Sequence, residues 1–263
     1  MNLYEQTYQC LMQADPVIKK TDVKKLLQDW KSNTLNRNDF ELHRIEIPGR
    51  PDKPELIDPS QLKQRKLGSE LGRAILIHAI LHIEFNAINL ALDAVYRFRD
   101  MPDQYYSDWL SVAVEEAYHF SLLEQRLSEY GYAYGDFPAH NGLWEMVLKT
   151  DHDVLTRMAL VPRVLEARGL DVTPGMIDRL EKVGASRIVE ILRIILRDEI
   201  GHVAIGSRWY KHCCDLQNLD ADKTFRELLV EYMGRGLNGP LHQEARLEAG
   251  FSQEEIDELL KMV

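Results

Sequence analysis

The chain has 263 residues, of which 45% are hydrophobic and 28% are charged, and its formal net charge is −10. This composition supplies a sizeable core and excludes a disordered chain. The acidic balance argues against a broad basic surface for nucleic acid, although a local basic patch within an acidic total stays open.

The N-terminal quarter is expected to contain two short helices and an irregular arm. Helical periodicity dominates the whole chain, and strand-like alternation is scarce. Residues 1 to about 33 predict the two helices. The following segment contains Pro48, Pro51, Pro54 and Pro59, and each proline resists helix formation and restricts its neighbour. We expect this segment to lie as an extended arm over the surface of something larger.

Four long helices are predicted in the middle of the chain, from about 62 to 99, 104 to 130, 141 to 168 and 186 to 216. Pro102 separates the first two, and Gly131 ends the second. Asn141 is the expected cap of the third helix, which ends at Gly169. Thr173-Pro174 predicts a cap followed by proline at the first position of a further helical stretch, which Gly184 divides from the fourth long helix.

Shorter helices are expected after residue 216, with a break from Gly234 through Pro240. The chain shows neither a low-complexity region nor a flexible linker that would separate two domains. The sequence therefore predicts one all-α domain over residues 1–263. Its parts would be N-terminal helices and a proline-rich arm (1–61), a ferritin-like four-helix bundle (62–216) and C-terminal helices (217–263).

The three cysteines, Cys10, Cys213 and Cys214, do not resemble a disulfide framework, because their number is odd and two are adjacent. We expect small buried hydrophobes in a reducing compartment, with a redox-active or metal-binding pair as the alternative. The N-terminus lacks the basic start and apolar core of a signal peptide. The apolar stretch 74–98 carries too many polar residues for a lipid-facing span. These features predict a cytoplasmic protein without a membrane partner.

Two of the predicted helices place an acid and an imidazole in their apolar stripe. In the fourth, apolar residues recur at the i, i+3, i+4, i+7 spacing of a buried face, and continuing this spacing reaches Glu199 and His202. The second helix repeats the pattern with Glu116 and His119. Both pairs read Glu-x-x-His, so each acid and histidine stack on the core side of one helix.

The other two long helices each contribute one acid to the same kind of stripe. Glu84 lies in the middle of the apolar face of the first helix, and Glu166 follows Leu155, Ala159 and Pro162 in the third. Pro162 must kink that helix or break its hydrogen bonding. Glu84 precedes Glu116 by 32 positions and Glu166 precedes Glu199 by 33, which indicates an internal duplication of two helical hairpins.

Charge makes metal the natural occupant of such a core. Four buried carboxylates would repel one another, and each would lose hydration at a cost of several kcal/mol. Two divalent cations neutralise four carboxylates and leave two neutral imidazoles as ligands. The donors are oxygen and nitrogen without thiolate, which suits iron or manganese better than a structural zinc site. The predicted metal ligands are Glu84, Glu116, His119, Glu166, Glu199 and His202.

Several residues near these ligands are expected to have roles other than binding the two metal ions. His78 and His82 point well away from Glu84 around the first helix, so they would bind another metal or lie against the arm as hydrogen-bonded histidines. Trp109 shares a face with Glu116 and would either pack in the core or relay electrons. Arg157 and Arg163, like most arginines among acids, are expected to form salt bridges, with contact to an anionic substrate as the alternative.

The chain also resembles an uncharacterised bacterial ferritin-like family, a domain of unknown function. The resemblance rests on stretches that cover nearly the whole chain, including HAILHIEFNAINLALDAVYRF, DWLSVAVEEAYHFSLL, RMALVPRVLEARGLDVTPGMI and LRDEIGHVAIGSRWY, with the arm PGRPDKP and the tail GPLHQEARLEAGF. It implies the same six ligands. More distantly, the chain is similar to the bacterial di-iron enzyme that hydroxylates a modified tRNA base, although its acidic balance does not favour a tRNA substrate.

We therefore expect two iron ions, with manganese or a mixed Mn/Fe pair as alternatives, and an oxygen-activating oxidoreductase or hydroxylase whose partners are dioxygen and a small-molecule substrate. A ferroxidase or iron-handling role, a di-manganese catalase, and a non-enzymatic helical protein with structural metal or none are the alternatives. A homo-oligomer is compatible with each of these functions.

Overall fold

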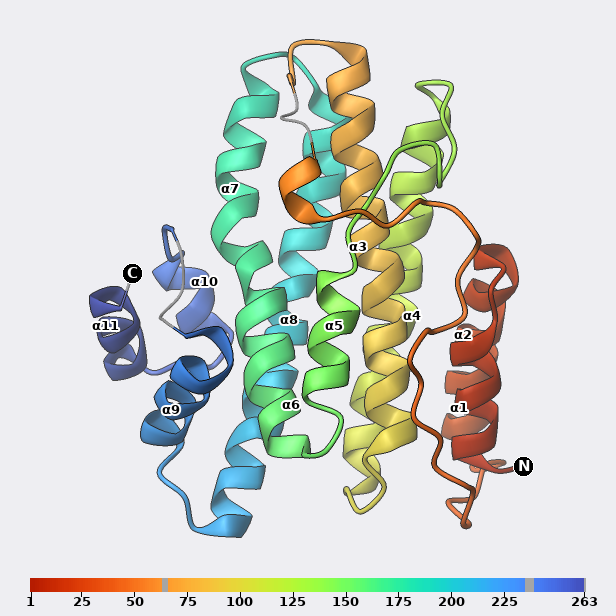
Figure 1. Ribbon diagram of the computed structural model, residues 1–263, viewed down its shortest axis with the longest axis vertical. Helices are drawn as coiled ribbons and strands as arrows, with labels where there is room; N and C mark the ends of the chain where they lie inside the picture. Colours follow the sequence, from red (N-terminus) through yellow and green to blue (C-terminus); the bar gives the residue numbers. More distant parts are fainter. Residues whose placement is uncertain (63–65, 235–238, 263) are drawn as a thin grey trace. The chain divides into compact units, whose positions relative to one another are not determined.

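The computed structural model describes residues 1–62, 66–234 and 239–262. Within these ranges every regular element is helical (Figure 1), which confirms the predicted all-α class. The chain divides into two compact units, Met1–Leu148 and Lys149–Val263. The boundary falls between the two halves of the sequence that repeat the acid and Glu-x-x-His pattern.

The first unit begins with the two short helices that the sequence predicts, α1 (Leu3–Met12) and α2 (Pro16–Lys31). Both start at a side-chain cap. The side chain of Asn2 accepts hydrogen bonds from the first turn of α1, and Asp15 does the same for α2. Pro16 occupies the first position of α2, where its missing N–H costs nothing. α1 packs on α3, and α2 packs on α4.

The centre of the first unit is the pair α3 (Glu70–Arg97) and α4 (Asp103–Ser128), which lie side by side (Figure 1). The predicted start of the first long helix at Leu62 is wrong. A short 3₁₀ helix, η1 (Pro59–Gln61), lies there instead, and α3 begins only after Ser69, whose hydroxyl accepts from the Gly72 amide at 3.1 Å.

Helix α3 is long and apolar enough to cross a membrane, with a mean hydropathy of 1.6 over its best window, but 78% of that window is buried. The core helix of a globular protein can be equally long and apolar, and it is buried in this way. The burial of α3 agrees with the prediction of a helix buried in protein.

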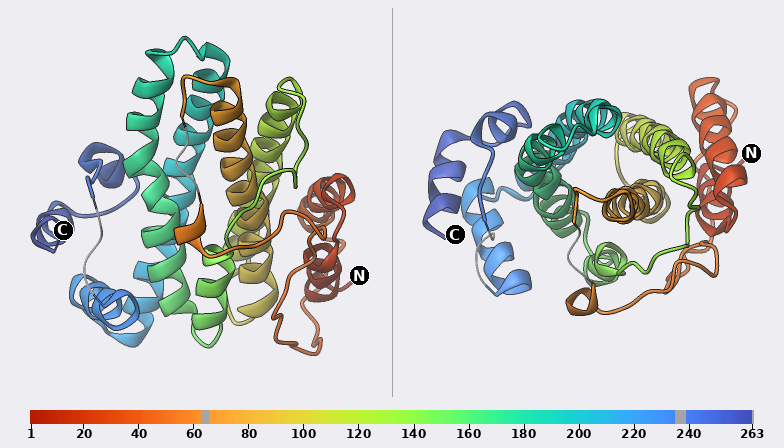
Figure 2. Two further views of the ribbon diagram at one scale, coloured as in Figure 1. Left: turned by 45° about the horizontal axis from the view of Figure 1, so that its top comes forward. Right: turned by 90° about the horizontal axis from the view of Figure 1, so that it is seen from above.

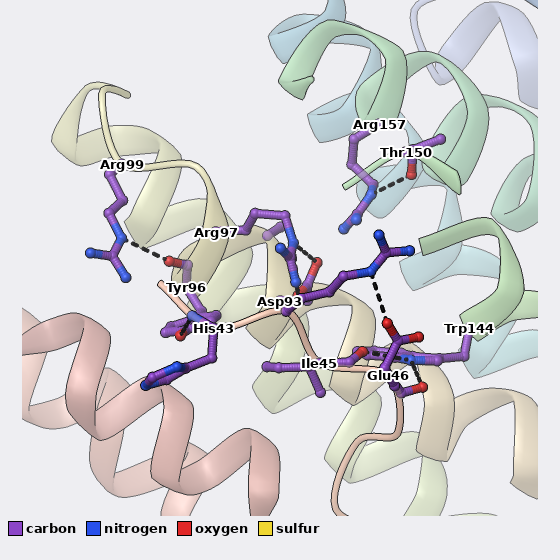
Figure 3. Close-up of polar contacts among 12 residues, drawn as sticks. His43, Ile45, Glu46, Asp93, Tyr96, Arg97, Arg99, Trp144, Thr150 and Arg157 are labelled. Carbon is purple, nitrogen blue, oxygen red and sulfur yellow. Dashed lines mark hydrogen bonds and ion pairs between the residues drawn. The ribbon is translucent and has the colours of Figure 1, made fainter. Parts of the chain in front are cut away.

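The segment between α2 and η1 is the arm that the sequence predicts. It runs over the helices of the first unit, whose side chains hold it by polar contacts. Figure 3 shows three of them: Trp144 Nε1 donates to the carbonyls of Ile45 at 3.3 Å and Glu46 at 3.1 Å, and the His43 amide donates to the Tyr96 hydroxyl at 2.7 Å. Trp144 belongs to α5 (Gly142–Lys149). Side chains of the helices thus satisfy some of the backbone groups of the arm.

A buried lysine ties the same arm to α1 and α3. Lys19 on α2 is 0% exposed, and its ammonium group donates to the carbonyls of Leu11 at 3.0 Å and Gly49 at 2.8 Å and to the side-chain oxygen of Asn89. Burial lowers the pKa of Lys19 to about 7. Gly49 has to be glycine, because a Cβ there would lie 2.2 Å from the backbone of Met12.

The second unit contains one long helix, α8, and shorter helices on either side of it in sequence. Figure 2 shows α9, α10 and α11 gathered beside α7 and α8. The elements are α6 (Val154–Leu160), the π-helix η2 (Val161–Glu166), α7 (Ala167–Glu181), α8 (Ser186–Gln217), α9 (Ala221–Met233), α10 (Gln243–Glu248) and α11 (Gln253–Lys261).

The predicted third helix is wrong in both its continuity and its end. The chain leaves the helix after Lys149 and re-enters it at Val154, where the Asp153 carboxylate caps α6 by accepting from the Thr156 amide at 2.8 Å. Gly169 and Pro174 both lie inside α7, so neither marks a boundary. A glycine inside a helix costs only about 1 kcal/mol, which the packing of α7 on α8 offsets.

The other predicted boundaries of the second unit agree with the structure. α8 spans the predicted fourth helix, and Gly184 before it has a φ of +70°. Gly234 ends α9 in the left-handed region, as expected, while residues 235–238 of the predicted break lie outside the described residues. Cys10, Cys213 and Cys214 are all buried and free, which confirms the prediction of small buried hydrophobes.

Candidate metal centre

Three of the six predicted ligands meet in the core of the first unit. Glu84 on α3 and Glu116 and His119 on α4 each offer a ligand atom, and these atoms lie within 4.8 Å of one another. His119 Nδ1 is 3.2 Å from Glu116 Oε2 and 3.4 Å from Glu84 Oε2. At most 2% of each residue is exposed. Two carboxylates thus converge on one imidazole away from water.

The packing of α3 on α4 explains why these polar groups are buried. Glu84 lies between Leu81 and Ile88 on a face of α3 that is buried along its length, as the stripe in the sequence predicts. The ring centroids of Phe85 and Phe120 lie 5.7 Å apart between the two helices, one position after each ligand group. The apolar contacts hold the helices together, so the acid and histidine cannot turn toward solvent.

Burial and mutual repulsion determine the protonation of this cluster. Burial raises the pKa of Glu84 well above its usual 4.5, and the neighbouring Glu116 raises it further. Burial alone would lower the pKa of His119, but its hydrogen bonds to Glu116 and Glu84 raise that pKa to about 11. Both shifts mean that the cluster without metal retains protons at neutral pH. A divalent cation would replace them.

The cluster offers the donor atoms of a metal site. Glu84 Oε2 is buried and faces His119 Nδ1 at 3.4 Å, so this oxygen points into the cluster where a cation would lie. The donors are two carboxylates and one imidazole without thiolate. A divalent cation would bind these donor atoms and offset the repulsion between the acids, so the residues fit a metal ion.

The second unit carries the other three predicted ligands. Glu199 and His202 lie one turn apart on α8, with His202 Nδ1 3.8 Å from Glu199 Oε2, and His202 is 1% exposed. Glu166 is the last residue of η2 and is partly buried. Segment η2 packs on α8, where Pro162 contacts Gly206 so closely that a Cβ on this glycine would lie 2.3 Å from the proline ring. The second Glu-x-x-His is thus confirmed as a one-turn pair on a helix.

The π-helical form of η2 was not predicted. The sequence indicated a kink or a loss of hydrogen bonding at Pro162, and the chain responds by widening a whole turn. Arg163, in the same turn, forms the predicted salt bridge, and its partner is Glu255 of α11. Arg157 donates from Nε to the Thr150 hydroxyl at 2.7 Å.

The histidines excluded from the ligand set are bound elsewhere in the first unit. His82 Nδ1 lies 2.8 Å from the Tyr134 hydroxyl, and His82 Nε2 lies 3.2 Å from the His140 carbonyl. His78 Nε2 accepts from the Gly135 amide at 2.9 Å. Their partners belong to the loop after α4, whereas the sequence suggested the proline-rich arm. Trp109 is buried, with its ring centroid 6.3 Å from that of Tyr105, so it packs in the core.

The family of the chain is shown by its sequence relatives. The model of a family described as "Protein of unknown function (DUF455)" matches residues 12–257, a range that includes all six predicted ligands. The chain belongs to the DUF455 family. It is similar to a protein of Haemophilus influenzae (strain ATCC 51907 / DSM 11121 / KW20 / Rd) described as "Uncharacterized protein", with 50% identity over 214 residues, 79% of this chain and 74% of the relative.

No solved structure matches this DUF455 member. The descriptions of the family and of the relative name no activity. The chemistry of this DUF455 chain therefore has to be argued from its own buried acids and histidines.

Proposed function

We propose that the chain is a ferritin-like, dinuclear metal carboxylate protein that holds two iron ions and activates dioxygen to oxidise a small-molecule substrate. The observation that carries the proposal is the buried Glu84–Glu116–His119 cluster, in which two acids and an imidazole retain protons that a cation would replace. The proposed ligands are Glu84, Glu116, His119, Glu166, Glu199 and His202.

The duplication in the sequence supports the full set of six. The Glu84, Glu116 and His119 pattern recurs 82 to 83 positions later as Glu166, Glu199 and His202. In the first unit the acid and the Glu-x-x-His lie on packed helices, α3 and α4, and in the second they lie on η2 and α8, which also pack on each other. A Glu from each of two helices and Glu-x-x-His from each of two others is the ligand set of ferritin-like di-iron and di-manganese proteins.

The side chains of the site would balance the charge of the metal ions, supply donor atoms and exclude water. Four carboxylates balance the charge of two divalent ions, and the two histidines add neutral nitrogen donors. The apolar stripes of α3 and α4 keep water away from the acids, which strengthens their interaction with a cation. Bound ferrous ions would supply reducing equivalents and open coordination positions for dioxygen chemistry.

Oxygen uptake tests this function. Metal-free protein is loaded with Fe(II) without oxygen and then mixed with aerated buffer, and both oxygen consumption and the Fe(III) absorption are followed. We expect one rapid phase of oxygen uptake at about two Fe(II) per chain, absent from a Glu116→Ala, Glu199→Ala double variant. Uptake that continues with each further addition of Fe(II) alone would indicate a ferroxidase instead. Uptake no faster than that of free Fe(II) would contradict the proposal.

Substrate dependence separates the remaining alternatives. Uptake that becomes catalytic only with an added organic substrate and a reductant is the signature expected of an oxygenase. Evolution of oxygen from hydrogen peroxide by Mn-loaded protein would instead support a di-manganese catalase.

A further inference from the structure

Arg163 is a fully buried cation of the second unit. It lies in the middle of η2, its side chain is 0% exposed, and Nη2 is 2.5 Å from Glu255 Oε1 on α11. Its Nε donates to the Ser207 hydroxyl of α8 at 3.3 Å. The guanidinium carbon lies 4.2 to 4.7 Å from the centroids of three aromatic rings, those of Tyr210, Phe225 and Phe251.

The carboxylate that Arg163 meets is itself held in place. Glu255 is 2% exposed and completes the capping box of α11: its Oε2 accepts from the Ser252 amide at 2.8 Å, and its own amide donates to the Ser252 hydroxyl at 3.0 Å. One oxygen of Glu255 thus fixes the start of α11 and the other binds Arg163. Removing one partner of such a buried pair destabilises the protein, because the other charge then remains without compensation.

Two neighbouring residues hold the widened turn of η2. Pro162 lies against Gly206 of α8, one turn beyond His202, with no room for a Cβ. Arg163 contacts α8 through Ser207 and also reaches Glu255 of α11. The backbone of η2 has π-helical hydrogen bonding, which is rare and is frequently found as single turns at functional sites. The last residue of this turn is Glu166.

We propose that Arg163 is a positioning residue. Its ion pair with Glu255 anchors the π-helical turn to the C-terminal helices, and this anchor keeps Glu166, at the end of the turn, oriented as a metal ligand. The inference rests on the proposed function in taking Glu166 as a ligand. It assigns the C-terminal helices a role in the metal site, although none of them carries a predicted ligand.

A second buried pair in the same unit provides a matched control. Arg246 of α10 binds Asp171 of α7 through two hydrogen bonds, of 2.9 Å and 2.8 Å, and both side chains are 0% exposed. This pair also fastens the C-terminal helices to the unit, but it contains no residue of η2. Loss of either pair should lower stability, whereas only loss of the Arg163 pair should release the turn that ends at Glu166.

The test compares Arg163→Gln and Glu255→Gln with Arg246→Gln in the full chain. The first readout is amide hydrogen exchange of residues 161–167 in metal-free protein. We expect at least about tenfold faster exchange there in the two variants of the Arg163 pair and wild-type exchange in Arg246→Gln, at similar losses of Tm. Wild-type exchange in folded Glu255→Gln, or an equal acceleration in Arg246→Gln, would overturn the inference.

The second readout is titration with Co(II), whose visible spectrum reports coordination. In the variants of the Arg163 pair we expect about 10- to 100-fold weaker binding of one ion and a changed spectrum, while Arg246→Gln keeps both affinities. Faster exchange with unchanged Co(II) binding would overturn the role of Arg163 in the metal site. Wild-type protein that binds no Co(II), Fe(II) or Mn(II) would overturn the proposed function. The exchange data are collected without metal, so they show separately whether Arg163 holds the turn.

Discussion

Replacing Glu84 by glutamine should stabilise the protein in the absence of metal. The substitution keeps the shape of the side chain and removes an acid that is buried beside Glu116. Because burial and this neighbour raise the pKa of Glu84 well above 4.5, the folded protein holds the proton to a higher pH than the unfolded chain does. Between these two pKa values folding must therefore take up a proton from solution.

The magnitude follows from the pH. Proton uptake costs about 1.4 kcal/mol for each pH unit between the unfolded pKa and the raised folded pKa. A raised acid pKa leaves stability unaffected below its unfolded value and lowers it as pH rises toward the folded value. Glutamine avoids this cost, so the stability gained by Glu84→Gln should be almost nothing at pH 4.5, grow by about 1.4 kcal/mol per pH unit above it, and level off once the folded pKa is passed.

Urea unfolding with a chelator present, followed by far-ultraviolet circular dichroism from pH 4.5 to pH 8, measures this difference. Glu55→Gln is the control, since Glu55 is exposed in the same unit, and it should change the free energy of unfolding by less than about 0.5 kcal/mol. A Glu84→Gln variant no more stable than wild type at pH 7, or a gain that does not grow with pH, would refute the reasoning.

Three further predictions concern contacts outside the cluster. Lys19→Met removes an amine that faces the Asn89 oxygen and two carbonyls and that can still donate two hydrogen bonds when neutral, so it should cost about 2–4 kcal/mol at high pH. Because burial lowers the pKa of Lys19 to about 7, the wild-type advantage should shrink as pH falls from 10 to 7, as pH-dependent urea unfolding can show. Gly206→Ala should lower the free energy of unfolding by about 1–3 kcal/mol, measured by the same method, because its methyl group would overlap Pro162. Trp144→Phe keeps an aromatic side chain, although a smaller one, and removes the N–H donor to the arm. Hydrogen exchange should therefore accelerate over residues 43–49 while α3 stays protected.

The helices that the sequence located well are those with an uninterrupted apolar stripe. α8 and α4 agree with their predicted ranges to within two residues, and the Glu-x-x-His pairs fall on their buried faces, because the helical period fixes which residues share a face. The meeting of Glu84 with Glu116 and His119 could be anticipated for the same reason, once the two helices were expected to pack as neighbours.

The errors arose where local signals compete with packing. Gly169 and Pro174 resembled a stop and a start, but the contact of α7 with α8 outweighs their helix penalties of about 1 and about 3 kcal/mol. The break before α6 has a signal in the capping residue Asp153, which the long apolar pattern around it obscured. The partner of Arg163 lies 92 positions away, and no local pattern identifies a contact of that separation.

Metal content per chain tests the central claim most directly. Protein purified from unsupplemented cells, and protein reconstituted with Fe(II) without oxygen, would be analysed by inductively coupled plasma mass spectrometry next to the Glu116→Ala, Glu199→Ala double variant. We predict about two iron or manganese ions per wild-type chain and almost none in the variant. Wild-type protein that carries no such metal even after reconstitution, or a variant that retains both ions, would contradict the dinuclear carboxylate site.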